Sequence, residues 1–131
     1  MKLSRTVAYA VQATLQLAKN SSDGPIPCSR IASEGKMPER FLLQILRNLV
    51  THGILRSTRG VEGGYSLTRS VAEISLLEVI EAIEGPVQFE SQASPILNHD
   101  GQVKLHQAFT QITETARHQL HAIKLSDLLS A

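Results

Sequence analysis

The sequence predicts a mainly α-helical fold, a winged helix-turn-helix with a small β-hairpin wing, followed by a long C-terminal dimerisation helix. Three observations support this fold class: two short helices joined by a tight turn, an alternating strand pattern around a glycine-rich segment, and a long apolar seam near the C-terminus. The chain has 131 residues, of which 42% are apolar and 4% aromatic, with no Trp. We therefore expect one core, built mainly from aliphatic side chains.

Charge is divided unevenly along the chain, although the net charge is only +1. Residues 1–69 hold ten Lys and Arg against four Asp and Glu, a net charge of +6. Residues 70–131 hold three against eight, a net charge of −5. A basic half of this kind points to nucleic acid or another acidic surface as its partner.

The single cysteine, Cys28, excludes an intramolecular disulfide. The sequence shows no signal-peptide pattern and no apolar stretch long enough to cross a membrane. We therefore expect a cytoplasmic protein with no membrane partner.

Helix signals start at Ser4, the expected N-cap of a first helix over residues 4–20, where apolar positions follow a 3.6-residue period. A short second helix is expected from Pro27 to about Glu34. A tight break at residues 35–37 follows it. Two helices joined by a three-residue turn that contains glycine form a helix-turn-helix pattern.

The third helix is expected to carry Pro38 in its first turn and to end at Gly53. Its apolar residues are spaced so that they share one face towards the core, namely Leu42, Ile45, Leu46 and Leu49. The opposite stripe holds side chains that contact bases or phosphates when a helix lies in a DNA groove, namely Arg40, Gln44, Arg47 and Thr51. An ordinary solvated helix face is the alternative interpretation of this stripe.

Residues 54–58 and 65–69 alternate as β-strands do, and residues 59–64 between them form a glycine-rich hairpin tip, which makes the hairpin a wing. An arginine beside glycines, here Arg59, can approach the narrow minor groove, where the negative potential is strongest. A plain glycine-rich hairpin is the alternative. A phosphate-cradling loop is excluded, because the segment lacks the Gly-Lys-Ser/Thr ending and leads into a strand.

A fourth helix is expected to open with a capping box at residues 75–78 (Ser-Leu-Leu-Glu) and to end at Gly85. Its periodic apolar positions are Leu76, Val79, Ile80 and Ile83. Residues 85–101 then lack periodicity and are predicted to be a loop and a possible effector region.

From residue 102 onward the apolar positions step by three and four residues, close to a coiled-coil repeat. These positions are Leu105, Phe109, Ile112, Ala116, Leu120 and Ile123, and the first five form the predicted seam. One small domain has no obvious place to bury so long a helix, so we expect these residues to form a dimer interface. The predicted organisation is a DNA-binding domain over 1–84, a loop over 85–101, and a dimerisation helix with a C-terminal tail over 102–131.

The segment Arg59-Gly-Val-Glu-Gly-Gly-Tyr-Ser-Leu67 resembles the Arg-Gly-x-x-Gly-Gly-Tyr-x-Leu wing signature of the Rrf2 family of bacterial winged-helix transcriptional regulators. The resemblance extends over nearly the whole chain, through Lys2-Leu3-Ser4, Tyr9-Ala10, Ile31-Ala32, Phe41-Leu42, Gly53-Ile54-Leu55, Glu84-Gly85-Pro86 and Leu125-Ser126-Asp127-Leu128.

The resemblance implies a homodimeric, sequence-specific DNA-binding regulator, usually a repressor, that binds a palindromic operator in double-stranded DNA. The residues it implies for the major groove are Arg40, Leu43, Gln44 and Arg47. Those it implies for the wing are Arg59, Gly60, Gly63, Gly64 and Tyr65, and those for the DNA backbone are Lys2, Ser4 and Arg5. Leu43 stands where some members carry an acidic residue and can contact a thymine methyl, so we expect a different DNA site.

No cofactor and no metal site is expected. Cluster-binding members of the family carry three cysteines in the loop before the long helix, whereas residues 85–105 hold none. Cys28 is a minor candidate for a redox-sensing thiol, because Arg30 and the start of the second helix can lower its pKa. A weak metal or pH site is a second minor candidate, although the spacing fits no ligand motif of its residues, His99, His106, His118 and His121.

No constellation of nucleophile, base and carboxylate stands out, so the chain is not expected to be an enzyme. The main hypothesis is a dimeric transcriptional regulator without an iron–sulfur cluster, controlled by an unknown ligand or protein partner. The alternative is a winged-helix protein-interaction module that does not bind DNA specifically.

Overall fold

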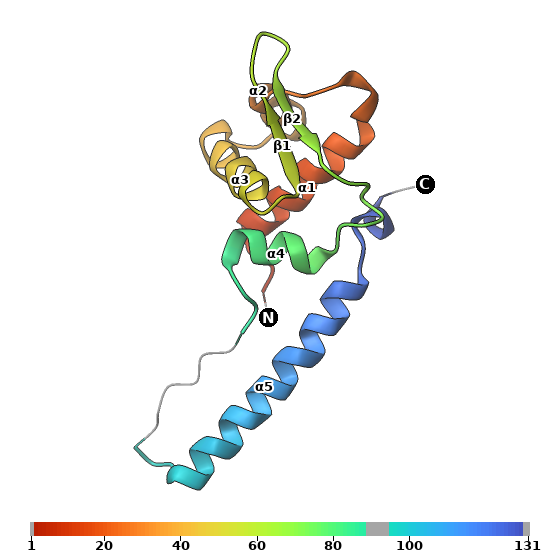
Figure 1. Ribbon diagram of the computed structural model, residues 1–131. Helices are drawn as coiled ribbons and strands as arrows, with labels where there is room; N and C mark the ends of the chain where they lie inside the picture. The colour runs from red at the N-terminus through yellow and green to blue at the C-terminus, as the bar shows by residue number, and fades with distance from the viewer. Residues whose placement is uncertain (1, 89–94, 130–131) are drawn as a thin grey trace.

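A computed structural model describes residues 2–88 and 95–129 of the chain (Figure 1). Its elements are, in order, α1 (Arg5–Lys19), the 3₁₀ turn η1 (Ser21–Asp23), α2 (Cys28–Gly35), α3 (Glu39–Thr51), β1 (Leu55–Thr58), β2 (Gly64–Leu67), α4 (Leu76–Glu84), α5 (His99–Ala122) and the 3₁₀ turn η2 (Leu125–Leu128). The two strands form one antiparallel hairpin. A mainly helical chain with one small hairpin confirms the predicted fold class.

The core of the molecule lies between α1, α2, α3, α4 and the base of the hairpin. Every large side chain in it is aliphatic or Met, as the composition suggests. The predicted inner face of α3 is confirmed, because Leu42, Leu46 and Leu49 are 0% exposed and Ile45 is 2% exposed. This burial fixes the opposite stripe of α3 towards solvent.

Both helices that were expected to begin at a proline begin one residue after it. Pro27 and Pro38 are the N-cap residues of α2 and α3, with extended backbone (ψ 151° and 122°). An extended conformation at the cap places the ring outside the helix, where it blocks no hydrogen bond. Ser4 is the N-cap of α1 as predicted, and its hydroxyl accepts a hydrogen bond of 3.1 Å from the Val7 N–H.

The break between α2 and α3 uses Lys36, not Gly35, as its left-handed residue (φ 55°). Gly35 has a different role, because a Cβ there would lie 2.6 Å from the Gln16 side-chain oxygen and 2.7 Å from the Gln12 amide nitrogen. Its carbonyl accepts a 2.8 Å hydrogen bond from that same Gln12 amide. The missing side chain therefore lets α1 pack closely against the end of α2.

Helix α4 begins with the predicted capping box, in which Ser75 and Glu78 exchange hydrogen bonds. Its inner face agrees with the predicted periodic positions only at Val79, and its other buried residues are Leu77 and Ala82. Leu76, Ile80 and Ile83 remain half-exposed. A 100° step per residue lets the broad apolar side of this helix present either edge to the core, and packing against α1 and α3 selects this one.

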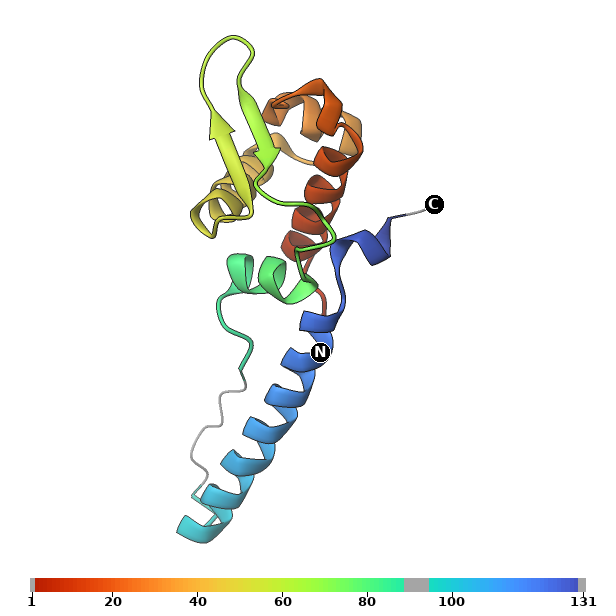
Figure 2. The ribbon, with the colours of Figure 1, turned by 45° about the vertical axis from the view of Figure 1, so that its right-hand side comes forward.

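Helix α5 starts at His99, three residues before the predicted start, because Asn98 caps it by accepting a 2.7 Å hydrogen bond from the Gly101 N–H. Part of the predicted loop, residues 89–94, lies outside the described residues. Figures 1 and 2 both show α5 extending away from the rest of the molecule. None of the helices in the described segments combines the length and the apolarity needed to cross a bilayer.

The chain returns to the core after α5. The Leu76 N–H donates to the Ile123 carbonyl (2.8 Å), and the Leu125 N–H donates to the Ile74 carbonyl (2.9 Å). Leu125 is 0% exposed and belongs to the same core cluster as Ile74. The segment after α5 is thus built into the body that holds α1 to α4.

Candidate nucleic-acid interface

The stripe predicted for base contact lies on the outer face of α3. Arg40, Gln44 and Arg47 are exposed, whereas Leu43 is half-buried. The Gln44 amide donates to the Asn48 side-chain oxygen at 3.2 Å, which orients this amide along the helix. The stripe therefore presents two cationic side chains and one amide to a partner.

The wing is a tight hairpin whose register pairs Leu55 with Leu67 and Thr58 with Gly64. The Gly63 N–H donates to the Gly60 carbonyl at 3.0 Å and closes the tip. A Cβ at Gly63 would lie 2.2 Å from the Thr58 carbonyl oxygen, so only glycine fits there. Arg59 and Gly60 are exposed at this tip.

The base of the wing is attached to the segment before α2. The Tyr65 N–H donates to the Ile26 carbonyl at 2.8 Å, and the Ile26 N–H donates to the Tyr65 carbonyl at 2.9 Å. Gly64 lies so close to this segment that a Cβ would meet the Ile26 carbonyl carbon at 2.3 Å. Tyr65 is half-buried and packs against the core. These contacts fix the wing relative to α2 and α3.

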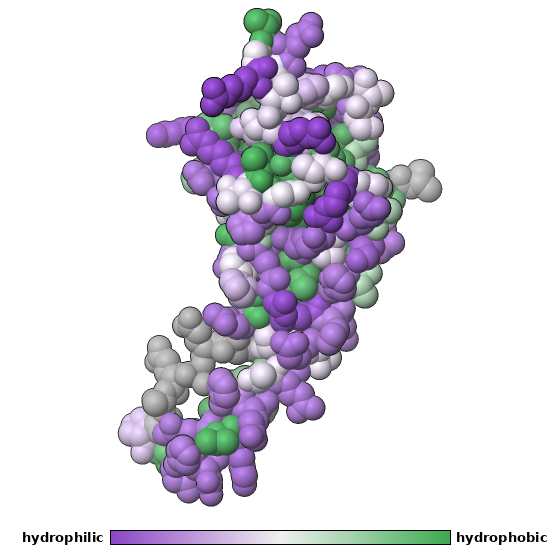
Figure 3. Space-filling model, viewed as in Figure 1, coloured by the Kyte–Doolittle hydropathy of each residue, from purple (hydrophilic) through white to green (hydrophobic). Residues whose placement is uncertain are grey.

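The arginines fall into two groups by their partners. Arg30, Arg69 and Arg117 form ion pairs with carboxylates. The guanidinium groups of a second set form no ion pair and no hydrogen bond within residues 2–88 and 95–129. This set consists of Arg5, Arg40, Arg47, Arg56 and Arg59. Figure 3 shows strongly hydrophilic side chains projecting over α3 and the hairpin. Unpaired guanidinium groups in this region create a positive field that favours a polyanion.

Arg56 is the cation of the hairpin that sequence reasoning missed. It lies on β1 opposite Ser66 and is exposed, while its neighbour Leu55 is buried. The signal was present in the strand alternation, because an inward Leu55 requires an outward Arg56.

The N-terminal residues implied for DNA backbone contact differ in their surroundings. Lys2 and Arg5 are exposed. The Ser4 hydroxyl already accepts the capping hydrogen bond from Val7. Lys2 and Arg5 therefore offer free charge, whereas Ser4 positions the start of α1.

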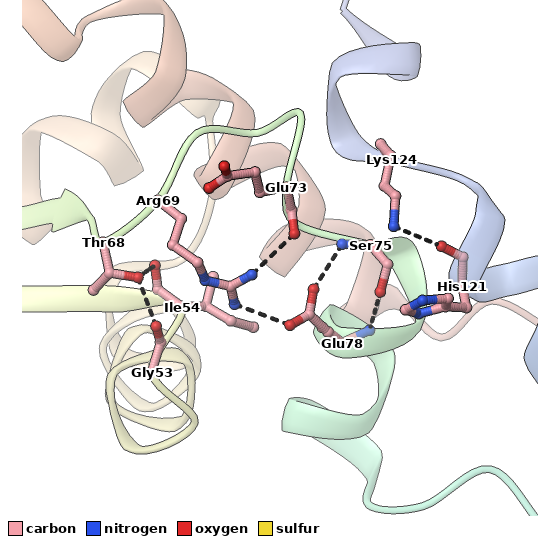
Figure 4. Close-up of polar contacts among 9 residues, drawn as sticks. All are labelled: Gly53, Ile54, Thr68, Arg69, Glu73, Ser75, Glu78, His121 and Lys124. Carbon is pink, nitrogen blue, oxygen red and sulfur yellow. Dashed lines mark hydrogen bonds and ion pairs between the residues drawn. The ribbon is translucent and has the colours of Figure 1, made fainter.

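A polar network joins the end of α3, the end of the wing and the start of α4 (Figure 4). The Thr68 hydroxyl contacts the Gly53 carbonyl at 2.6 Å. Arg69 donates to the Glu73 carbonyl and to the Glu78 carboxylate, both at 2.9 Å. Burial alone raises the pKa of Glu78, but hydrogen bonds from Ser75 and Arg69 outweigh burial and leave that pKa below its ordinary value.

The seam residues of α5 differ in their exposure on the single chain. Ile112 is 53% exposed and Leu105 is 36% exposed, and the other three are half-buried, namely Phe109, Ala116 and Leu120. Thr113 is the one fully buried side chain among the described residues of α5. Figure 3 shows hydrophobic surface among hydrophilic side chains near the free end of this helix.

Cys28 does not have the environment expected of a reactive thiol. Burial raises the pKa of the Cys28 thiol, and the negative charge of Glu39 raises it further. Arg30 was expected to lower this pKa, but its guanidinium is engaged by Asp23 and Glu34 at 2.9 Å each. Among the residues that the structure describes, no three His, Cys, Asp or Glu side chains gather as a metal site requires.

Comparison with known proteins identifies a family that the chain matches. The model of the Rrf2 family, described as "Iron-dependent Transcriptional regulator", matches residues 3–131. CymR of Bacillus subtilis, an HTH-type transcriptional regulator, is 28% identical over 99% of this chain and 91% of its own length. The solved structure of CymR, described as the global cysteine regulator of B. subtilis, has a TM-score of 0.76 at 26% identity. It covers 98% of this chain and 95% of that one.

Two further similarities agree with the family. The structure of IscR from T. potens has a TM-score of 0.72 at 27% identity, covering 98% of this chain and 85% of that one. A Mycobacterium tuberculosis protein named as an HTH-type transcriptional regulator is 41% identical over 87 residues, or 66% of this chain. That match spans 54% of the tuberculosis protein, about half its length.

The iron in the family description can be tested against the residues of this chain. Iron–sulfur clusters are held chiefly by cysteine thiolates. The sequence contains one cysteine, Cys28, whose thiol lies in the first turn of α2 with a raised pKa. Two copies would supply only two such thiols, so these residues do not fit a cluster of that kind.

Proposed function

Because this chain belongs to the Rrf2 family of transcriptional regulators, we propose that it is a homodimeric, sequence-specific DNA-binding repressor that works without an iron–sulfur cluster. Residues 1–84 form the DNA-binding part and residues 102–131 the dimerisation part in this proposal. An unknown ligand or protein partner acts through residues 85–101 and the long helix. Repression is the mode that the family resemblance favours.

The observation that carries this proposal is the set of unpaired arginines on α3 and the hairpin. Arg40, Arg47 and Arg59 have no carboxylate partner in the described segments, unlike Arg30 and Arg69. A guanidinium without a protein partner is available for guanine edges and phosphates. Helix α3 would then enter the major groove, and the wing tip would enter the adjacent minor groove.

Contacts are assigned from exposure and from the family resemblance. The major-groove residues are Arg40, Leu43, Gln44 and Arg47. The wing residues are Arg59 and Gly60 at the tip, with Gly63, Gly64 and Tyr65 positioning it. The residues proposed to contact the DNA backbone are Lys2 and Arg5. Ser4 positions the start of α1 beside them.

The dimer is supported by two exposed apolar residues on the seam of α5, Leu105 and Ile112. A 24-residue helix with Leu105 and Ile112 exposed gains stability when these side chains leave water. A two-fold axis would present two α3 helices to successive major grooves. The operator is then expected to be a palindrome whose half-sites are about one helical turn, or a multiple of it, apart.

Selection of bound fragments from a genomic library by the purified full chain tests this function. We expect one enriched palindromic motif, and an affinity that falls with salt at a logarithmic slope of about −0.9 per phosphate neutralised. Arg47→Ala should relax the motif at one position of each half-site, whereas the control Lys19→Ala should leave it unchanged. Enrichment of no motif would instead identify a protein-interaction module.

A reporter gene tests the direction of regulation. The selected site, placed over a promoter, should lower transcription when the chain is produced, because a bound dimer covers the promoter. A rise in transcription would make the protein an activator and overturn the repressor assignment.

A further inference from the structure

A cleft of about 300 Å³ lies between α1, α3 and α4, beside the stripe proposed to contact DNA. Arg5 and Tyr9 line it from α1, Phe41 and Gln44 from α3, and Ile83 from α4. Its size is at the lower end of the range for small-molecule sites. No described residue that lines the cleft is acidic.

Two walls of the cleft are apolar and uncovered. Phe41 is 69% exposed, although an aromatic side chain of this size is usually covered. Ile83 on α4 packs against the edge of the core and stays half-exposed. The space between these walls suits a small apolar body such as a ring or a branched aliphatic chain.

The polar side of the cleft is cationic. Arg5 is exposed, and its guanidinium forms no ion pair or hydrogen bond with another described residue. An arginine binds a carboxylate through two parallel hydrogen bonds, which favours this anion over a neutral group. The amides of Gln44 and Asn48, joined at 3.2 Å, add further donors on the α3 wall.

We propose that this cleft binds a small organic carboxylate with an aromatic or branched aliphatic body. The carboxylate lies on Arg5, and the body lies between Phe41 and Ile83. Binding of the ligand stands on the cleft alone. Its regulatory effect rests on the proposed function, because the ligand occupies Arg5 and borders Gln44, two residues assigned to the DNA interface, and so weakens operator binding.

The binding step is tested on the full ¹⁵N-labelled chain by NMR titration with benzoate and isovalerate. The neutral amides benzamide and isovaleramide are the matched probes. We expect the carboxylates to shift the signals of Phe41, Gln44, Asn48 and Ile83. The amides should bind roughly tenfold more weakly or worse, because they lack the charge-assisted hydrogen bonds. Equal binding of acids and amides, or shifts elsewhere only, would overturn the site.

Two variants test whether the ligand binds within the cleft. Arg5→Gln should weaken benzoate binding roughly tenfold or more, while Lys19→Gln, a loss of an exposed cation at the other end of α1, should leave it unchanged. Ile83→Trp fills the cleft from α4 and should abolish the shifts, provided its melting curve shows a folded chain. Benzoate binding to either Arg5→Gln or folded Ile83→Trp at the wild-type level overturns the proposal.

Operator binding with and without benzoate, at matched ionic strength, tests the regulatory step. Wild-type affinity should fall in benzoate, and Ile83→Trp should not respond. If benzoate shifts the cleft signals but the chain selects no DNA motif, the proposed function fails and the cleft stands. If DNA binding is normal and the cleft signals do not move, the cleft proposal alone fails.

Discussion

Arg59 is the residue on which the wing hypothesis depends most directly. It is exposed next to Gly60, whose φ of 114° turns the hairpin tip. Arg59→Ala is expected to weaken binding to the selected operator by about 1–3 kcal/mol, because a minor-groove guanidinium would be lost. Fluorescence anisotropy with Lys19→Ala as the control measures this effect. Equal affinities of the two variants would contradict a wing contact.

Cys28, in contrast to Arg59, is expected to have no effect on DNA binding. Burial and the charge of Glu39 keep its pKa raised, so little thiolate forms at neutral pH. Alkylation of Cys28, followed by mass spectrometry, should be slower than alkylation of the free amino acid cysteine. Peroxide treatment should leave operator affinity unchanged. A peroxide effect that disappears in Cys28→Ser would instead show a redox switch.

At the scale of elements, the wing depends on how its base is seated. Gly60 has open space around it, so Gly60→Ala introduces backbone strain only, about 1–3 kcal/mol. Gly64→Ala adds a clash with the Ile26 backbone, where a Cβ would lie 2.3 Å from the carbonyl carbon. Gly64→Ala should therefore melt at a lower temperature than Gly60→Ala. Matching melting temperatures would mean that the Ile26–Tyr65 pairing does not hold the wing.

The start of α4 should respond to acid. Because the pKa of folded Glu78 is lowered, its carboxylate stabilises the fold above the unfolded pKa, and this contribution is lost as the pH falls through the folded pKa. Glu78→Gln keeps a capping box but removes the charge. At neutral pH it should cost less than about 1 kcal/mol, since the pair with Arg69 is partly solvated.

Thermal melts across the acid range check this expectation for Glu78. The Glu78→Gln variant should lose less stability than the wild type as the pH falls. A third variant, Glu78→Ala, should be less stable than Glu78→Gln at every pH, because it also loses the side-chain acceptor for the Ser75 N–H. Identical acid profiles for the wild type and Glu78→Gln would assign the acid response to other carboxylates.

At the scale of the whole molecule, the proposed dimer depends on the seam of α5, where Leu105 and Ile112 are exposed. Ile112→Glu places a charge at the centre of this seam and should convert the dimer to monomer in analytical ultracentrifugation. Operator affinity should fall with it, because one monomer reaches only one half-site. Gln107→Glu, on another side of the same helix, is the charge-matched control. A dimeric Ile112→Glu variant would place the interface elsewhere.

Local signals allowed much of this molecule to be predicted from sequence. The capping box at Ser75, the inner face of α3 and the glycine-rich wing each depend on neighbouring residues, and the structure has them. The inner face of α4 was not predictable, because packing against α1 and α3 chooses between two apolar edges. The left-handed residue at Lys36 and the close approach at Gly35 depend on the two amides that α1 brings near.

In the candidate site too, features set by neighbouring residues were predictable and features set by tertiary packing were not. The outward positions of Arg40, Gln44 and Arg47 follow from helical period, and Arg56 could have been found from strand alternation. The cleft beside Arg5 could not, because its walls come from three helices that are distant in sequence. The base contacts themselves remain predictions.

The return of the chain after α5 has a consequence for biosynthesis. Leu125 fills the core beside Ile74, and the Leu76 amide depends on the Ile123 carbonyl. A growing polypeptide that has emerged only as far as α4 therefore lacks a piece of its own interior. Helices form locally and early on the ribosome, but the final packing of the N-terminal body must wait until the segment after α5 has been translated. Completion of the surface proposed to contact DNA is in this way timed by the synthesis of the residues that follow the long helix.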